Sequence, residues 1–485
     1  MTIKITFNIK SAIVAMLFFA AVIPLRADTI TVTNTNDSGP GSLRQALAEA
    51  NDGDTITFAV TGTIGLTSGE LLVAKSITIS GPGAENLAVD GNAKSRVFHI
   101  GVGMTVTISD LGIMNGRAFG FFPDNEGGGI YNDHATLTLN NCMISGSVAE
   151  NEGGGIYNGA TGGSASLHIS GSVVSSNSAP FGAGIHNDAR MGGTALLQVS
   201  DSTLSGNFGQ YGGAIFTIAD FGDDETTLTL SNCSISDNSA DAVAGGVYNQ
   251  DSTLTLSNCT VSGNSTQGYG GGFYSAGFGD TTLRNSTISG NSAVSFGGGI
   301  YNDVAATLTI SNSTLSDNSA NSAGGIYSDA FVWIGNTILK AGAAGENIVN
   351  GIGFVISNGY NLSSDDGGGY LTGPGDQINT DPLLGPLQNN GGPTLTHELL
   401  PDSPAINAGD PSFTPPPFYD QRGPGFDRVV NGRIDIGSFE VQSGGPTPTP
   451  TPSPTPTPTA TPTPTPRPTP TPRPRPAPRP RPTPR

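Results

Sequence analysis

Side chains that could act as acids, bases or nucleophiles are few in this chain of 485 residues, and they share no common spacing. General acid–base cleavage needs paired carboxyl groups, or a Ca²⁺-binding carboxylate cluster with an Arg or Lys base, on one face. Adjacent carboxylates occur at Asp223-Asp224 and Asp365-Asp366, each in a polar stretch typical of a solvated turn. We expect weak Ca²⁺ contact there, and we predict no catalytic residues, no cofactor and no dedicated metal site. The remaining candidates occupy non-equivalent positions: Lys75, Lys94, Lys340, His134, His168, His186 and His397.

A second group of candidates is aromatic and regularly spaced. Each ring follows an aliphatic residue or Phe that comes after a triplet of small residues, as in Gly127-Gly-Gly-Ile-Tyr-Asn132. If the first of these two residues faces inward on a strand, the ring after it faces outward. Such a row could bind sugars, or it could be a self-stacking ladder that stiffens one face, and we favour the ladder. The candidate ligand-facing row is Tyr131, Tyr157, His186, Phe216, Tyr248, Tyr274, Tyr301 and Tyr327.

These rings belong to a sequence motif that occurs eight times in the chain. The residue after the small triplet marks each copy, and successive copies lie 26, 29, 30, 32, 26, 27 and 26 residues apart. A repeat of this length predicts a solenoid, whose units bury their apolar faces by stacking on their neighbours. The marker residues are Ile130, Ile156, Ile185, Ile215, Val247, Phe273, Ile300 and Ile326.

A second phrase, Leu228 to Ala240, recurs within each period and alternates apolar with polar residues. Alternation of period two directs Leu228 and Leu230 inward, and it resumes after a Ser-Asn slip with Cys233 and Ile235 inward. Each period therefore predicts three short strands and three corners, with Gly and Asn at the corners. The repeats contain no helical apolar stripe, so we predict an all-β, right-handed parallel β-helix over residues 54–375, with regular repeats over 127–340.

Two more rows align across the periods. Stacked Asn amides can hydrogen-bond along a solenoid, whereas the row of Cys and Ser marks a position with little space. Adjacent coils would place Cys233 and Cys259 about 4.8 Å apart, so a disulfide stays open, although the exchange with Ser favours buried free thiols. The small row is Cys142, Ser172, Ser202, Cys233, Cys259, Ser286 and Ser313. The Asn row is Asn177, Asn207, Asn238, Asn264, Asn291 and Asn318.

The repeats resemble those of polymorphic outer-membrane protein passenger domains. Gly212 to Ile215 reads Gly-Gly-Ala-Ile, and an apolar-x-x-Asn phrase follows, as at Ile235 to Asn238. The family places Phe at the first position of the second phrase, where this chain has Ile, Val or Leu. The resemblance covers residues from about 105 to 340, and it implies the β-helix fold and a location at the cell surface.

The N-terminal part reads as an export signal followed by a cap. Residues 1–27 carry two Lys and then an apolar run, the layout of a secretory signal peptide. Within residues 28–53 we predict a strand from Thr29 to Asn34 and a short helix from Leu43 to Ala50, capped by Ser42. Such a helix would cover the open end of the solenoid. Ser42 to Leu47 also resembles the Ser-Leu-Arg-Glu-Ala-Ile box near the start of many secreted bacterial β-helix proteins.

Residues 376–440 differ from the repeats in composition and in sequence motifs. Five phrases succeed one another there with Pro-rich spacers, and together they resemble the choice-of-anchor region of the Q type. That resemblance implies display at the cell surface rather than an activity. The phrases are Asp381 to Leu387, Asn390 to Thr394, Leu400 to Ile406, Asp420 to Gly423 and Asp435 to Glu440.

Residues 441–485 hold a run of Thr-Pro and Arg-Pro pairs that begins at Pro446. This composition cannot form a core, so we predict a disordered tail in extended polyproline II conformation. All six Arg of the tail lie between Arg467 and Arg485. We therefore expect the tail to contact anionic polymers of the cell envelope.

Charge narrows the possible partners of the remaining body. The tail takes 6 of the 20 basic residues and the signal takes 3, so 11 remain against all 39 acidic residues, a net charge of −28. This balance argues against nucleic acid and against anionic polysaccharide as a primary ligand. Past the signal, no apolar segment is long enough to span a membrane.

We predict an exported, non-catalytic cell-surface protein that acts in adhesion or surface interaction, with glycans or other cell surfaces as partners. Outward strand positions carry Thr and Ser, as at Thr227 and Thr229, and offer no acid–base constellation. Three alternatives stay open. β-Helices host polysaccharide lyases and hydrolases, the aromatic row suits a carbohydrate-binding module, and Thr rows on a flat face suit ice binding, although Ser166, His168 and Gln198 interrupt them.

Overall fold

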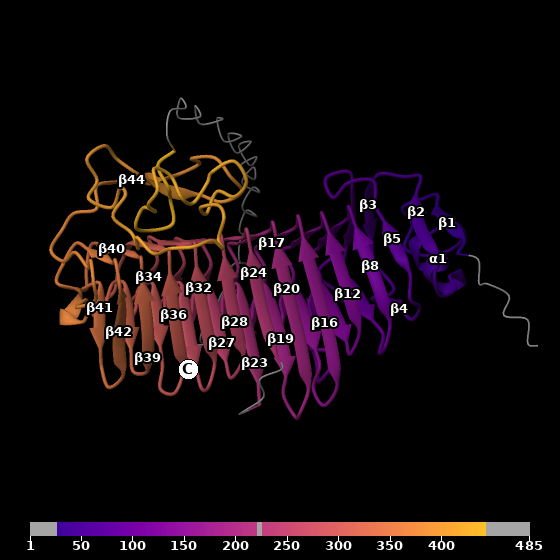
Figure 1. Cartoon of the computed structure of the whole chain (residues 1–485). Coiled ribbons are helices and arrows are strands. Elements are labelled where there is room, and N and C mark those ends of the chain that lie inside the picture. Colours follow the sequence, from indigo (N-terminus) through magenta and orange to yellow (C-terminus); the bar gives the residue numbers. More distant parts are fainter. Residues whose placement is uncertain (1–26, 221–225, 443–485) are drawn as a thin grey trace, which may run out of the picture.

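Short parallel strands stack along one axis in the computed structural model, which describes residues 27–220 and 226–442 (Figure 1). Residues 1–26 of the predicted signal, the Asp223-Asp224 pair and the predicted Pro-rich tail lie outside the described residues. The described part is an all-β, right-handed parallel β-helix, as the repeats predict. Each strand pairs with the equivalent strands of the coils before and after it, and in this way four parallel sheets form along the solenoid.

Sheet A has 13 strands: β1 (Thr29–Val32), β2 (Thr55–Phe58), β5 (Thr78–Ser80), β8 (Thr105–Ser109), β12 (Thr136–Asn140), β16 (Ser164–Ser170), β20 (Thr194–Ser200), β24 (Thr227–Ser231), β28 (Thr253–Ser257), β32 (Asp280–Arg284), β36 (Thr307–Ser311), β39 (Phe331–Gly335) and β42 (Phe354–Gly359). Sheet B has 12: β3 (Gly62–Gly65), β6 (Leu87–Asp90), β9 (Gly112–Met114), β13 (Met143–Ser145), β17 (Val173–Ser175), β21 (Thr203–Ser205), β25 (Ser234–Ser236), β29 (Thr260–Ser262), β33 (Thr287–Ser289), β37 (Thr314–Asn318), β40 (Ile338–Ala341) and β43 (Leu362–Ser363).

Sheet C has 11 strands: β4 (Leu71–Val73), β7 (Phe98–Ile100), β11 (Ile130–Asp133), β15 (Ile156–Gly159), β19 (Ile185–Ala189), β23 (Ile215–Ala219), β27 (Val247–Gln250), β31 (Phe273–Ala276), β35 (Ile300–Asn302), β38 (Ile326–Ser328) and β41 (Ile348–Asn350). Sheet D has 7: β10 (Arg117–Ala118), β14 (Val148–Ala149), β18 (Ser178–Phe181), β22 (Phe208–Tyr211), β26 (Ser239–Val243), β30 (Ser265–Thr266) and β34 (Ser292–Ala293).

The predicted register and the predicted inward faces are confirmed. Ile130 pairs with Ile156 in parallel, and the row continues in register to Ile326. Leu228 and Leu230 are fully buried, while the Thr residues beside them are half-buried. These rows form one continuous hydrophobic core that runs the length of the solenoid.

Corners depend on residues that tolerate a left-handed backbone. Asn232, between sheets A and B, has φ of 53°, and Gly153, before sheet C, has φ of 66°. At Gly154 a Cβ atom would lie 2.5 Å from the carbonyl oxygen of Ser178, so the next coil leaves no room for a side chain. Small triplets therefore recur because coils approach one another closely at this corner.

The two aligned interior rows form as predicted. From Asn177 to Asn291, each Asn amide donates from Nδ2 to Oδ1 of the Asn one coil further on, for example Asn238 to Asn264 at 2.9 Å. In the small row the Ser172 hydroxyl accepts the backbone N–H of Cys142 at 3.0 Å. All three cysteines are buried free thiols, so Cys233 and Cys259 are not bridged.

Sheet D departs from the predicted three strands per coil. Its strands follow the Asn corner, in a segment that we expected to be a turn. The inward side chains are mostly Ala, as at Ala118, Ala149 and Ala179, which pack into a small cluster of their own. Such short strands with one small inward residue produce little apolar alternation, so the sequence pattern did not indicate them.

Both ends of the solenoid are covered. Helix α1 (Leu43–Glu49) begins at Ser42, whose Oγ accepts the backbone N–H of Gln45, and it buries Leu43, Ala46 and Leu47 against the first coils. At the other end a 3₁₀ turn, η1 (Gly367–Gly369), is followed by Leu371, which packs on the same core. The described residues contain no helix long and apolar enough to cross a membrane.

Residues 376–440 fold back onto the outer face of sheet B instead of extending the solenoid (Figure 1). This segment holds the antiparallel pair β44 (Leu384–Gln388) and β45 (Thr396–Leu399). Thr287 donates from Oγ1 to Gln421 Oε1 at 2.6 Å, and Ser289 Oγ lies 2.9 Å from His397 Nε2. A second hydrophobic cluster joins the segment to the last coils through Ile338 and Phe439. Strands β29 to β40 of sheet B are therefore covered and offer little surface to a partner.

Candidate functional site

The predicted aromatic row is a continuous stack along the outer face of sheet C. Ring centroids of neighbours lie 4.6 to 5.5 Å apart from Tyr131 to Tyr327. His99 on β7 extends the row by one coil, with its centroid 5.0 Å from that of Tyr131. The sequence pattern missed His99 because no Gly triplet precedes it.

The stack leaves little ring surface for a ligand. Tyr131, Tyr157, His186 and Phe216 are at most 5% exposed, while Tyr248, Tyr274, Tyr301 and Tyr327 are half-buried. A sugar binds an aromatic ring through the ring face. Within the stack both faces of a ring are taken by its neighbours, so the geometry is that of the self-stacking ladder.

Several Tyr hydroxyls in the row are held by carboxylates. Tyr157 donates to Asp188 Oδ2 at 2.7 Å, Tyr301 donates to Asp329 Oδ2 at 2.9 Å, and Tyr274 donates to Asp303. Burial raises the pKa of Tyr248 to about 12, and burial together with the neighbouring carboxylate raises the pKa of Tyr157 further. These hydroxyls stay protonated at neutral pH and are not available as bases.

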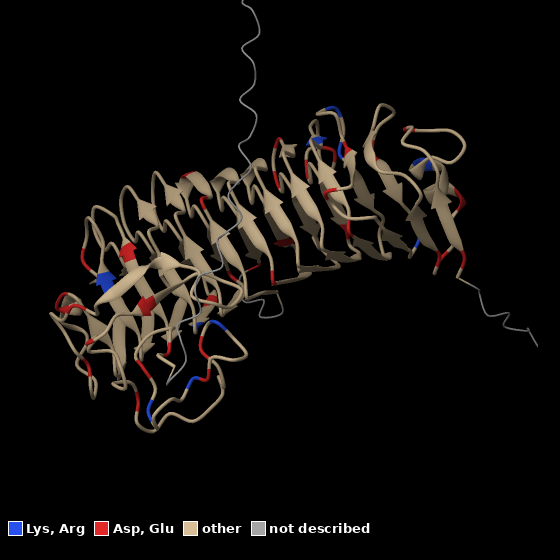
Figure 2. Cartoon of the chain, turned by 90° about the horizontal axis from the view of Figure 1, so that it is seen from above, with Lys and Arg blue, Asp and Glu red and all other residues tan. Residues whose placement is uncertain are grey.

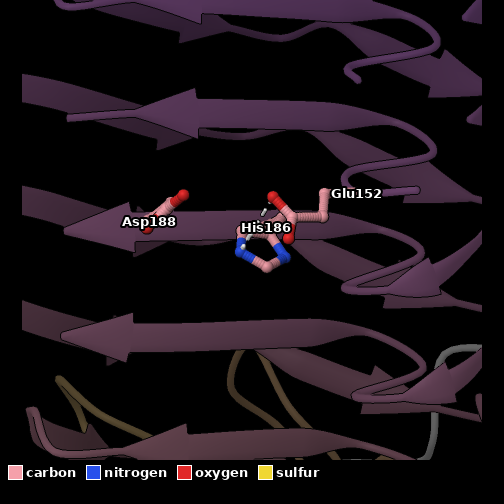
Figure 3. A group of neighbouring side chains, drawn as sticks. All are labelled: Glu152, His186 and Asp188. Carbon is pink, nitrogen blue, oxygen red and sulfur yellow. Dashed lines mark ion pairs between the residues drawn. The ribbon is translucent and has the colours of Figure 1, made fainter. Parts of the chain in front are cut away.

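A cluster of charged side chains lies beside the first half of the ladder and includes one of its rings, His186. Glu152, which precedes β15, and His186 and Asp188, both on β19, are buried, and their donor atoms lie within 4.8 Å of one another (Figure 3). His186 Nε2 is 3.8 Å from Glu152 Oε2. Outward residues of one strand are two apart, which places His186 and Asp188 side by side on the outer face of β19. We call this trio with Arg190 the Glu152 cluster.

Arg190 closes the Glu152 cluster toward solvent. Its guanidinium donates to Asp188 Oδ2 at 2.6 Å and to both oxygens of Glu152 at 3.0 Å. Burial alone would raise the pKa of Asp188, but the hydrogen bonds from Arg190 and Tyr157 hold it well below its usual range. At nearby Glu126, burial and the charges of Glu152 and Asp188 outweigh hydrogen bonds from Tyr157 and Asn151 and raise the pKa to about 8.

A second charged network lies in the earlier coils of β4, β7 and β11. Arg96 donates to Glu70 Oε2 at 2.6 Å, and His99 lies 3.2 Å from Glu70 and 3.5 Å from Asp133. Burial would lower the pKa of His99, yet hydrogen bonds to Asp133 and Glu70 outweigh it and raise the pKa to about 9. Every charge in this network has a partner, so we read it as structural.

The outer face of sheet A is more open. A shallow groove of about 320 Å³ is lined by His168, Gln198 and Thr229, and the outward row runs in register from Gln198 to Trp333. Six strands at about 4.8 Å spacing make this row about 24 Å long. The expected interruption of the Thr row at His168 and Gln198 is therefore where the face is hollowed.

An exposed aromatic patch ends this face. Phe331, Trp333 and Phe354 are 47%, 37% and 62% exposed, and the rings of Phe331 and Phe354 stack with centroids 5.4 Å apart. Trp333 is paired with Thr309, which borders a groove of about 210 Å³. The groove is lined by the apolar side chains of Ile310, Phe413 and Ile434 and by polar groups of Asn312, Asn336, Asn358, Tyr360 and Asp410. The sequence pattern missed the patch because the equivalent positions of the coil before it carry Thr307 and Thr309 rather than aromatic residues.

The remaining candidates from the sequence do not converge. Asp365 accepts the backbone N–H groups of Asn347 and Gly367, and Asp366 caps η1, so both carboxylates are structural. His397 is buried between sheet B and β44, whereas His168 lies on sheet A. Lys75 and Lys94 are exposed, in separate coils. No acid–base pair forms from these residues.

Comparison with known proteins gives a match to the family model described as right handed beta helix region, over residues 217–366. No curated protein matches the chain. Among solved structures, pectate lyase Pel9A is 15% identical with a TM-score of 0.42, covering 85% of this chain and 96% of that one. XylC, solved in complex with xylose, is 11% identical with a TM-score of 0.46, covering 75% and 88%.

The A-module of the Azotobacter vinelandii mannuronan C-5 epimerase AlgE6 is 15% identical with a TM-score of 0.33, covering 67% of this chain and 88% of that one. The family-model match and the strand register of the four sheets agree, and the fold of this chain is a right-handed parallel β-helix.

Proposed function

We propose that the chain binds neutral polysaccharide along the outer face of sheet A. The observation that carries this proposal is the exposed patch of Phe331, Trp333 and Phe354 beside a groove lined by both apolar and polar side chains. Exposed ring faces give apolar contact to the C–H side of a sugar, and the flanking polar groups can bind its hydroxyls. The row of about 24 Å that leads away from the patch suits an extended polymer.

Two features of the surface limit the class of polysaccharide that can bind. The acidic residues are spread along the coils, with few basic residues among them (Figure 2), and the body carries a net charge of −28. An anionic polymer would be repelled by this field, so we expect uncharged glycans to bind better. The proposal favours the carbohydrate-binding alternative over adhesion without a defined ligand, and it moves the binding face from the ladder to sheet A.

The test is binding of the mature chain to xylan, mannan, cellulose and alginate by affinity electrophoresis and calorimetry. We expect binding to at least one neutral polymer and little to alginate. Trp333→Ala should weaken binding about tenfold or more, because losing one stacked ring removes about 1.4 kcal/mol or more. Phe208→Ala, an exposed ring on sheet D, is the matched control and should leave binding unchanged.

Equal affinity of the wild-type chain and Trp333→Ala would refute the proposed face. Assays for new reducing ends and for unsaturated products on the same polymers separate binding from cleavage. Product formation would assign the lyase or hydrolase alternative.

We also propose that the protein is exported and displayed at the cell surface. Support comes from the signal-like segment at residues 1–27, the choice-of-anchor resemblance of residues 376–440 and the Arg-Pro tail. The cell-envelope contact belongs to the tail, whereas the glycan contact belongs to sheet A.

A further inference from the structure

Two ring nitrogens without partners lie inside the Glu152 cluster. His186 is 1% exposed, and neither Nδ1 nor Nε2 has a hydrogen-bond partner among the described residues. A buried imidazole normally donates one N–H and accepts at the other nitrogen. Leaving both hydrogen bonds unmade in a buried position is unfavourable. The His186 ring is therefore placed for a contact that the protein itself does not supply.

The same place carries an excess of buried negative charge. Glu152 and Asp188 face one guanidinium, that of Arg190, and both carboxylates are buried. Buried carboxylates persist when they are paired or when they bind a metal.

We propose that Glu152, His186 and Asp188 bind a divalent transition-metal ion, with Zn²⁺ as the ion that fits best. Figure 3 shows the Glu152 carboxylate over the His186 ring, with Asp188 further along the same strand. One imidazole nitrogen and two carboxylates are a ligand set that Zn²⁺ accepts, with bonds of about 2.0 to 2.2 Å. Ca²⁺ and Mg²⁺ prefer oxygen ligands alone.

A bound zinc ion would require the ligand atoms to lie slightly closer together than they do. Ligands of a tetrahedral zinc ion lie about 3.4 Å apart at these bond lengths. His186 Nε2 and Glu152 Oε2 are 3.8 Å apart, and the full set lies within 4.8 Å. Rotation of the two carboxylates would close this difference without moving β19.

Arg190 occupies the cation position when no metal is bound. Its side chain is 39% exposed, the most open of the Glu152 cluster, so it can turn outward as an ion enters. Glu152, Asp188 and Arg190 together carry one negative charge, whereas the two carboxylates with a divalent ion are neutral. Replacement of the guanidinium by the ion therefore removes the remaining buried charge.

The test is calorimetry of the untagged, EDTA-stripped mature chain with ZnCl₂. We expect one ion per chain with a dissociation constant on the order of 1 μM or below, unaffected by Ca²⁺ at about 1 mM. Cobalt substitution should give visible absorption bands from the bound ion. His186→Gln should weaken binding more than about tenfold, and His168→Ala, a histidine outside the cluster, should change nothing.

Arg190→Met distinguishes a metal site from a purely structural ion cluster. Removing the competing guanidinium should tighten zinc binding by about tenfold or more, whereas a structural role predicts no gain in affinity. If His186→Gln fails to fold, Arg190→Met still tests the proposed metal site. Absence of stoichiometric binding by both the wild-type chain and Arg190→Met would overturn the proposal, as would full affinity in folded His186→Gln.

Discussion

At the scale of single residues, polar groups inside the solenoid are as specific as the apolar rows. Each Asn of the interior row binds both neighbouring coils. Asn238 donates to Asn264 Oδ1 at 2.9 Å and to the carbonyl oxygen of Leu204 at 3.0 Å, and its own Oδ1 accepts from Asn207. Buried amides with all their partners add directionality that hydrophobic contacts lack.

We predict that Asn238→Ala lowers the free energy of unfolding by about 2 to 4 kcal/mol. The change leaves the Nδ2 group of Asn207 and the carbonyl oxygen of Leu204 short of a partner while buried. Ser234→Ala, on the half-buried outer side of β25, is the control and should cost less than about 0.5 kcal/mol. Chemical denaturation of the three proteins measures this, and equal losses would mean that the ladder contributes nothing specific.

Regular spacing decided which residues could be assigned from the sequence. The Asn row, the Cys and Ser row and the marker residues recur at the coil period, so their alignment predicted their contacts. Glu152 and His186 meet across 34 residues and occupy different positions in their coils. The pattern placed His186 in the aromatic row, where it does stack. Asp188 recurs as Asp133, Asp303 and Asp329, and Glu152 recurs as Glu126. Alignment along one row does not show that the residue before the triplet of one coil meets side chains of the next coil, so the cluster was not predicted.

At the scale of elements, helix α1 is fixed to the first coils by one carboxylate. Asp37 accepts hydrogen bonds from the backbone N–H groups of Thr67 and Ser68 at 3.1 and 2.8 Å, and from Arg44 of α1 at 2.7 Å. Burial alone would raise the pKa of Asp37, but the hydrogen bonds from Ser68, Arg44 and Thr67 outweigh it and hold the pKa well below its usual range.

We predict a pH-dependent contribution of Asp37 to stability. Because the folded pKa is lower than the unfolded one, the unfolded chain binds the proton more readily, and stability rises with pH. The contribution should be complete above about pH 5 and should shrink steadily as the pH falls below about 4. Asp37→Asn should therefore lower the melting temperature more at pH 7 than near pH 2. Glu49→Gln, on the exposed side of α1, is the control, and a loss for Asp37→Asn that is independent of pH would contradict the mechanism.

Elements without a regular pattern of large apolar residues could not be predicted from the sequence. Sheet D uses Ala, Gly or Thr as its inward residue, and such small side chains do not stand out from a turn. The packing of residues 376–440 on sheet B was not predicted for a different reason. Thr260 and Thr287 look like solvent-facing hydroxyls in sequence, yet both bind Gln421 across more than 130 residues. Long-range polar contacts of this kind leave no local pattern.

At the scale of the whole molecule, binding and attachment are assigned to separate parts of the chain. The C-terminal segment covers sheet B, the ladder occupies sheet C, and sheet A keeps an open face with the aromatic patch. The composition of the Arg-Pro tail cannot form a core, so we expect that its removal does not disturb the coils.

We predict that deleting Pro446–Arg485 releases the protein into the medium without changing its melting temperature. The six Arg give the tail the opposite sign to the body, and an anionic envelope polymer would hold it by charge. Attachment of this kind should weaken with added salt, because exposed charges are screened over about 8 Å at physiological ionic strength. Replacing the six Arg by Lys should preserve attachment, whereas replacing them by Gln should release the protein as the deletion does. Full retention of the deleted form at the cell surface would instead place the anchor in residues 376–440, which would then have to bind the envelope through the side that faces away from sheet B.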